Sequence, residues 1–92
     1  MLSTAFAATP NASRYLQQLC KHWSHKLDVT FDPNAGRIVF TAGDVLTLAA
    51  AEDGLRMELT TTPDSDALRM RQVVDDHLKR FAFREELEIV WS

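Results

Sequence analysis

Three histidines and one cysteine are the side chains of this sequence best suited to metal or nucleophile chemistry. His22 and His25 lie three residues apart, which makes them neighbours on a helix surface. Imidazole binds zinc, copper and iron, so this pair could share a metal ion. Two imidazoles alone bind a metal loosely. The simpler interpretation is a solvated His25 beside a His22 that packs at the edge of the core.

His77 falls within the apolar stripe of a second predicted helix. A histidine in such a place is usually partly buried and donates a hydrogen bond to a backbone or carboxylate oxygen. If helix packing brings His77 close to His22, the two helices would supply a pair of ligands. A metal- or haem-linked role with His22, His25 and His77 as ligands is therefore kept as the alternative hypothesis.

Cys20 is predicted to be a buried small hydrophobe. It lies among Leu16, Leu19 and Trp23 on the apolar side of the first predicted helix. A nucleophilic cysteine needs an exposed thiolate and a neighbouring base. A single cysteine also excludes an intramolecular disulfide and a cysteine-rich zinc module.

Arg84, Glu85 and Glu86 follow the second predicted helix. Paired carboxylates can perform acid–base chemistry, but alternation places Glu86 and Glu88 on the solvated face of a last strand. Arg84 is expected to cap helix carbonyls or to pair with an acid. The sequence has no glycine-rich phosphate loop, nucleophile elbow or metalloprotease motif, so we predict no catalytic residue and no cofactor.

Two helices must position these groups. Apolar residues at helical spacing predict the first over residues 10–26 and the second over residues 63–81. Thr9-Pro10 and Thr62-Pro63 open them, because threonine can cap free amides and proline suits the first helical position.

Alternating apolar residues predict the strands. Gly36 is expected to supply a positive φ in the turn that joins the second and third of them. The predicted strands cover residues 2–8, 27–32, 38–40, 45–50, 55–60 and 86–91.

The order β-α-β-β-β-β-α-β predicts an α+β two-layer sandwich, with an antiparallel sheet and both helices on one face. This order resembles the architecture of the TATA-binding protein. The 92 residues are enough for a single domain over 1–92.

The net charge of −3 conceals an uneven distribution. Residues 1–27 contain three bases and no acid, whereas residues 28–66 contain eight acids and two bases. The uncovered sheet face would present mostly acids and threonines, which repel phosphate, so we expect no nucleic acid as a partner. Such a mixed face suits protein contact or self-association.

No segment approaches 18 uninterrupted apolar residues, and residues 1–8 are too short for the core of a signal peptide. We therefore expect no membrane association and a cytoplasmic location.

Several segments together resemble a family of small bacterial proteins, the domain of unknown function 2218. They include Thr9-Pro10, Ser13 to Leu16, Leu19 to Trp23, Gly36 to Phe40 and Asp76 to Leu87, and the resemblance covers nearly the whole chain. It brings no catalytic residues with it. It implies a link to siderophore-interacting reductases and so an accessory part in iron handling.

The leading hypothesis is a non-enzymatic cytoplasmic binding or accessory module that acts through protein contacts. Its predicted functional surface is the basic shoulder of the first helix, with Arg14, Tyr15, His22 and Lys26, and Arg84 is a further candidate. The alternative is the metal- or haem-linked role in iron handling described above.

Overall fold

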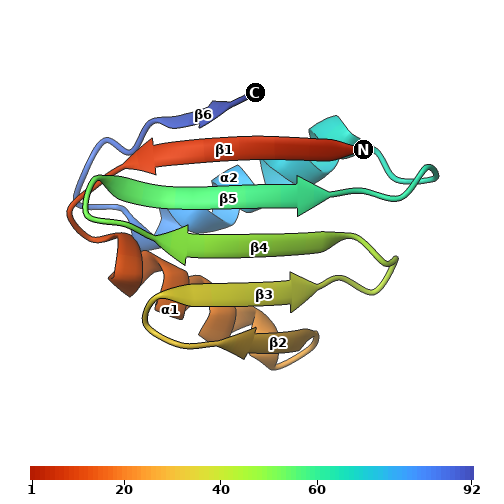
Figure 1. Cartoon of the computed structure of the whole chain (residues 1–92), viewed down its shortest axis with the longest axis horizontal. Helices are drawn as coiled ribbons and strands as arrows, with labels where there is room; N and C mark the ends of the chain where they lie inside the picture. Colours follow the sequence, from red (N-terminus) through yellow and green to blue (C-terminus); the bar gives the residue numbers. More distant parts are fainter.

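A six-stranded antiparallel sheet carries both helices on one of its faces in the computed structural model of residues 1–92 (Figure 1). The predicted fold class and the predicted element order are both confirmed. In chain order the elements are β1 (Leu2–Ala8), α1 (Ala12–Ser24), β2 (Asp28–Phe31), β3 (Ala35–Val39), β4 (Val45–Ala50), β5 (Gly54–Thr60), α2 (Ala67–Phe81) and β6 (Ile89–Trp91).

The strand order is β2-β3-β4-β5-β1-β6, so the first strand of the chain lies inside the sheet. β1 pairs with β5 along its whole length, from Leu2 opposite Thr60 to Ala8 opposite Gly54. β6 adds to the other side of β1. The start and the end of the chain are therefore neighbours, and this adjacency builds the site described below.

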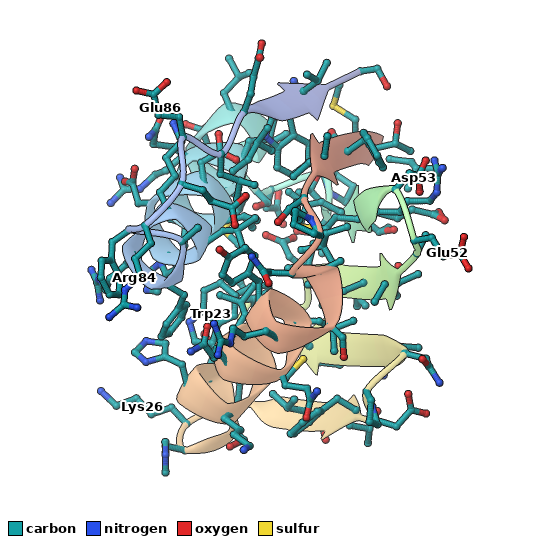
Figure 2. All side chains as sticks on the ribbon, turned by 90° about the vertical axis from the view of Figure 1, so that its left-hand side faces the viewer. Trp23, Lys26, Glu52, Asp53, Arg84 and Glu86 are labelled. Carbon is teal, nitrogen blue, oxygen red and sulfur yellow. The ribbon has the colours of Figure 1, made fainter.

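The core lies between the sheet and the helices, as the edge-on view in Figure 2 shows. Alternation in β5 turns Leu55, Met57 and Leu59 toward the helices, and all three are buried. From α1 the buried stripe includes Leu16 and Cys20. Apolar residues recur every two residues in the strands and every 3.6 residues in the helices, and together they form one apolar layer.

α1 is shorter than the predicted span 10–26. It begins at Ala12 with Asn11 as the N-cap residue, and no side chain caps it. The Thr9 hydroxyl instead accepts a hydrogen bond from the amide of Asn11 at 3.1 Å, because Thr9 lies two residues before the N-cap position. α1 ends at Ser24, where the chain turns toward β2.

α2 starts four residues after the predicted position 63 but ends at Phe81, as expected. Its N-cap is Asp66, whose carboxylate accepts a backbone amide of the first turn. The buried carboxylate of Asp44 holds the preceding segment out of the helix. It accepts the Thr62 amide at 2.8 Å and the Ser65 hydroxyl at 2.5 Å.

The expectation of a positive φ at Gly36 is wrong, because Gly36 lies within β3 and only Gly43 and Gly54 have positive φ values. The structure gives another reason for glycine here. A Cβ atom at Gly36 would lie 2.7 Å from the Sγ atom of Cys20, closer than such atoms approach. Gly36 thus lets α1 pack close to β3.

The last strand is shorter than predicted, and Glu86 and Glu88 lie in the loop before β6 rather than on a sheet face. The amide of Leu87 bonds to the carbonyl of Glu85, which keeps this segment in a turn. β6 begins only at Ile89.

The uncovered face of the sheet carries a few exposed apolar side chains among charged and hydroxyl groups. Leu2 is 58% exposed and Val90 is 56% exposed, and the guanidinium of Arg56 stacks on the ring of Phe6 at 4.9 Å. Self-association through this face stays a prediction. Neither helix has the length and apolar character needed to cross a membrane.

The close contact between Gly36 and Cys20 makes a testable prediction. We expect Gly36→Ala to lower the free energy of unfolding by about 1–3 kcal/mol, because the new methyl group overpacks a filled space. In a Cys20→Ala background, Gly36→Ala should lower the free energy of unfolding much less, because the Sγ atom that the new methyl group would meet is absent. Urea unfolding of the four proteins measures both costs, and equal costs in the two backgrounds would contradict this account of the glycine.

Candidate binding pocket at the start of the first helix

The carboxylate of Glu85 joins the segment after α2 to the start of α1. Its Oε2 atom accepts the Thr9 hydroxyl at 3.1 Å and the Asn11 side-chain amide at 3.0 Å. It also accepts the hydroxyl of Tyr15, which is buried. Three donors on one oxygen fix the position and rotamer of Glu85.

The same hydrogen bonds determine the charge of the site. The bonds from Tyr15 and Asn11 lower the pKa of Glu85, against the opposing effect of burial. Burial, and then the bond to Glu85, raises the pKa of Tyr15. At neutral pH the site therefore contains a carboxylate and a neutral phenol.

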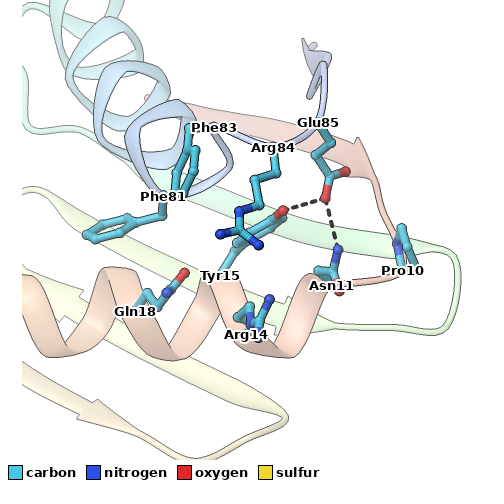
Figure 3. A pocket seen from close by; sticks show the side chains of 9 residues that line it. All are labelled: Pro10, Asn11, Arg14, Tyr15, Gln18, Phe81, Phe83, Arg84 and Glu85. Carbon is cyan, nitrogen blue, oxygen red and sulfur yellow. Dashed lines mark hydrogen bonds between the residues drawn. The ribbon is translucent and has the colours of Figure 1, made fainter.

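A pocket of about 580 Å³ opens beside this anchor, between α1 and the end of α2 (Figure 3). Phe81 and Phe83 form its apolar part, and Gln18 supplies an amide. Phe83 is 75% exposed, so its ring is accessible to a ligand that enters the pocket. The complete lining is Pro10, Asn11, Arg14, Tyr15, Gln18, Phe81, Phe83, Arg84 and Glu85.

Two guanidinium groups converge on the pocket from opposite ends of the chain. Arg14 comes from α1 and Arg84 from the segment after α2. The one salt bridge of the protein joins Arg56 to Asp53, so neither pocket arginine is paired with an acid. The expectation that Arg84 caps carbonyls or pairs with an acid is wrong, because its guanidinium stacks on the Phe83 ring at 5.4 Å.

The remaining residues of the predicted surface are distributed as follows. Tyr15 lines the pocket beside Arg14, although its side chain is largely buried and its hydroxyl is bonded to Glu85. His22 is exposed on α1, and Lys26 is exposed two residues after the helix ends; neither lines the pocket.

The three candidate metal ligands do not come together as one set. His22 and His77 are close, with ring centroids 5.3 Å apart, whereas His25 is exposed outside this pair. No group of three histidine, cysteine, aspartate or glutamate side chains could hold a metal ion. The prediction for His77 itself is confirmed: it is partly buried, and its Nδ1 atom donates to the Val73 carbonyl at 2.7 Å.

Burial of Cys20 is confirmed, because the side chain has no exposed surface. Burial raises the pKa of the thiol to about 11. Cys20 is therefore protonated at neutral pH, which is the inert state of a cysteine.

Sequence reasoning missed Glu85, Phe83, Gln18 and Asn11 as parts of a site. By sequence, Glu85 is only a neighbour of Glu86 in a pair of carboxylates, and nothing local marks it as different from Glu86. The exposed Phe83, directly before Arg84 in a segment with no apolar periodicity, was the one available indication.

The fold and the pocket define a small α+β protein with an arginine- and phenylalanine-lined pocket formed by the two ends of its chain. The family described as uncharacterized proteins conserved in bacteria, domain of unknown function 2218, matches residues 4–92, and this chain belongs to it. The resemblance noted in the sequence is thereby confirmed. No curated protein matches the chain.

The chain is also similar to the NMR structure of PA4090 from Pseudomonas aeruginosa. The two share 43% sequence identity with a TM-score of 0.76, over 99% of this chain and 94% of the other.

The Glu85 anchor has a predictable effect on acid stability. Because its pKa is lower in the folded state, its contribution is complete above pH ~4.5 and is lost as the pH falls through the folded value. Glu85→Gln should lower the free energy of unfolding at pH 7 by about 1–2 kcal/mol and reduce the further loss on acidification below pH ~4.5.

Urea unfolding at pH 7 and pH 3.5 measures both effects. Glu58→Gln is the matched control, because Glu58 is exposed on the uncovered sheet face and accepts no hydrogen bond from another side chain. If the two variants behave alike at both pH values, Glu85 is not an anchor.

Proposed function

We propose that this protein is a small cytoplasmic, non-enzymatic binding module that acts through contact with a partner protein, and that the pocket between α1 and α2 receives an acidic side chain of that partner. The observation that carries the proposal is the pair Arg14 and Arg84. Two unpaired guanidiniums face one pocket beside the exposed ring of Phe83.

The chemistry of these groups favours a carboxylate ligand. A guanidinium presents a planar fork of donors that matches a carboxylate in two parallel hydrogen bonds. The pocket already contains one carboxylate, that of Glu85. It accepts hydrogen bonds from three donors and forms no salt bridge with Arg14 or Arg84. The first turn of α1 has no acid, so its N-terminal dipole adds to the positive potential.

The aromatic side chains favour a protein partner. Arginine and aromatic residues are enriched among the residues that dominate the free energy of protein–protein binding. Phe83 and Phe81 give an apolar wall on which an aromatic or aliphatic side chain can pack next to the bound carboxylate.

A non-enzymatic role is supported by the state of Cys20. This thiol is the best potential nucleophile of the chain, and it is fully buried with a pKa of about 11. Its side chain is used in packing against β3 at Gly36.

A short capped peptide, acetyl-Glu-Phe-Ser-amide, tests the proposal by NMR titration of isotope-labelled protein. We expect saturable shifts at Arg14, Gln18 and Phe83, including the side-chain Nε–H signals of the two pocket arginines. Arg14→Gln and Arg84→Gln should each weaken binding about 5-fold, or about 1 kcal/mol, because each removes one cation of a solvent-accessible pair.

Arg37→Gln is the matched control, since Arg37 is exposed on the uncovered sheet face. A peptide with lysine in place of glutamate should not bind. The proposal fails if the acidic peptide produces no saturable shifts, or if Arg37→Gln weakens its binding as much as the pocket variants do.

A metal-linked accessory role is the second candidate, and one observation favours it. The bond of His77 Nδ1 to Val73 leaves Nε2 as the free lone-pair atom of the neutral ring, and the His22 ring lies beside it. Burial, and then the charges of His77, Arg80, His25 and Lys26, lower the pKa of His22. The positive charges of Arg80 and Lys26 also oppose a metal cation at the same place. This opposition ranks the role second.

Titration with Cu(II) and Zn(II) tests the second candidate by calorimetry. A metal site on the two helices requires one ion per chain, lost in His77→Gln and retained in His25→Gln. Absence of uptake, or equal uptake by both variants, would remove the candidate.

A further inference from the structure

The carboxylate of Glu85 has one oxygen that no group of the protein uses. The hydrogen bonds from Thr9, Asn11 and Tyr15 all end on Oε2, and Figure 3 shows two of them. The second oxygen, Oε1, accepts none. Every buried side-chain nitrogen or oxygen of the protein has a hydrogen-bond partner, so Oε1 is not a buried atom. Because Glu85 lines the pocket, Oε1 can accept a donor from a ligand there.

This oxygen carries negative charge that the protein does not neutralise. The bonds from Tyr15 and Asn11 lower the pKa of Glu85, so its carboxylate is ionised at neutral pH. No base of the protein forms a salt bridge with it. A hydrogen bond from a cationic donor to an ionised oxygen is about twice as strong as one between neutral groups. An ammonium group is therefore the donor that suits Oε1 best.

The free oxygen and the two guanidiniums belong to one site. Arg84 is next to Glu85 in the sequence, and Arg14 is next to Tyr15, whose hydroxyl is bonded to Glu85. Consecutive Cα atoms are about 3.8 Å apart, so both arginines begin one residue from the bonded pair. All four residues line the same pocket. The pocket thus presents two positive charges and one negative charge to whatever enters it.

A ligand that matches these charges carries a carboxylate and an ammonium group a few bonds apart. A carboxylate alone would satisfy the guanidiniums of Arg14 and Arg84, but it would meet the like charge of Glu85. An ammonium group beside it replaces this repulsion by a charge-assisted hydrogen bond. Within one residue of a protein chain, a free ammonium and a side-chain carboxylate occur together in an N-terminal aspartate or glutamate.

We propose that the pocket binds the N-terminal residue of the partner protein, an aspartate or a glutamate, with its side-chain carboxylate on Arg14 and Arg84 and its α-ammonium group on Oε1 of Glu85. This inference rests on the function proposed above and specifies which acidic residue of the partner enters the pocket.

The size of the pocket favours a chain end over a free amino acid. Its volume of about 580 Å³ lies within the range of sites for drug-sized ligands, which corresponds to about two or three residues. Phe81 and Phe83 provide an apolar wall for the side chain that follows the N-terminal residue. A free amino acid has the same two charged groups but leaves this wall empty.

Two peptides that differ only at the N-terminus test the inference by NMR titration. One is Glu-Phe-Ser-amide with a free amine, and the other is acetyl-Glu-Phe-Ser-amide. We expect the free-amine peptide to bind about 5-fold more tightly at pH 7, because it forms one more ion pair at a partly exposed site.

The unaltered protein also allows a test by pH. At pH 9.5 the advantage of the free-amine peptide should disappear, because an α-amino group with a pKa of ~8 is then neutral. The charges of the protein side of the pocket stay the same: arginine keeps its proton, and burial raises the pKa of Tyr15 above its ordinary value. Binding of the acetylated peptide should therefore change little between the two pH values.

Variants assign the advantage to Glu85. Glu85→Gln should remove most of it at pH 7, whereas Arg14→Gln should weaken both peptides by a similar factor and leave their ratio unchanged. Glu86→Gln is the matched control, because Glu86 is an exposed acid of the same segment that does not line the pocket. Circular dichroism verifies that the variants are folded.

Two further ligands identify the chemical group and its source. Ala-Phe-Ser-amide keeps the ammonium group without the side-chain carboxylate, and it should bind at least about 5-fold more weakly than Glu-Phe-Ser-amide. Free glutamate should also bind more weakly than Glu-Phe-Ser-amide. If free glutamate binds as tightly as the peptide, the ligand is an amino acid, and the assignment to a protein N-terminus is overturned.

The outcomes separate this inference from the proposed function. If the two glutamate peptides bind equally at pH 7, or if the advantage of the free amine persists at pH 9.5, the ammonium contact is overturned and the carboxylate pocket remains. If neither peptide binds, both proposals fall. Binding of the free-amine peptide alone would support the ammonium contact and contradict the capture of an internal acidic side chain.

Discussion

One carboxylate oxygen ties the segment after α2 to the start of α1. Glu85 accepts hydrogen bonds from Thr9, Asn11 and Tyr15, which are 70 or more residues away in sequence. Because Glu85 is fixed there, the segment between α2 and β6 passes over the start of α1 and presents Arg84 to the pocket.

Polar contacts also determine how α2 lies on the sheet. The Arg71 guanidinium donates to the buried Ser3 hydroxyl at 2.9 Å, and the Trp91 indole donates to Asp75 at 2.8 Å. These contacts tie α2 to β1 and β6. The side of α2 that they leave free faces α1, where His77 contacts His22. The position of α2 against α1 thus depends on the same first and last strands that lie near the pocket.

Much of the architecture was accessible from the sequence. The periodicities of β5 and α1 predicted which side chains form the core, and Cys20 and His77 are placed as expected. Errors arose where a distant group competes with local preference. Asp44 holds the segment before α2 out of the helix, and Gly36 accommodates a sulfur atom from another element rather than a turn.

The sequence by itself determined the elements, their apolar faces and the surplus of positive charge on α1, because these follow from residue spacing over one or two turns. Tertiary structure alone decided that Arg14 meets Arg84, that Glu85 is a bonded anchor and that the last strand is short. The physical reason is that these contacts depend on strand order and register, which bring together residues that no local pattern connects.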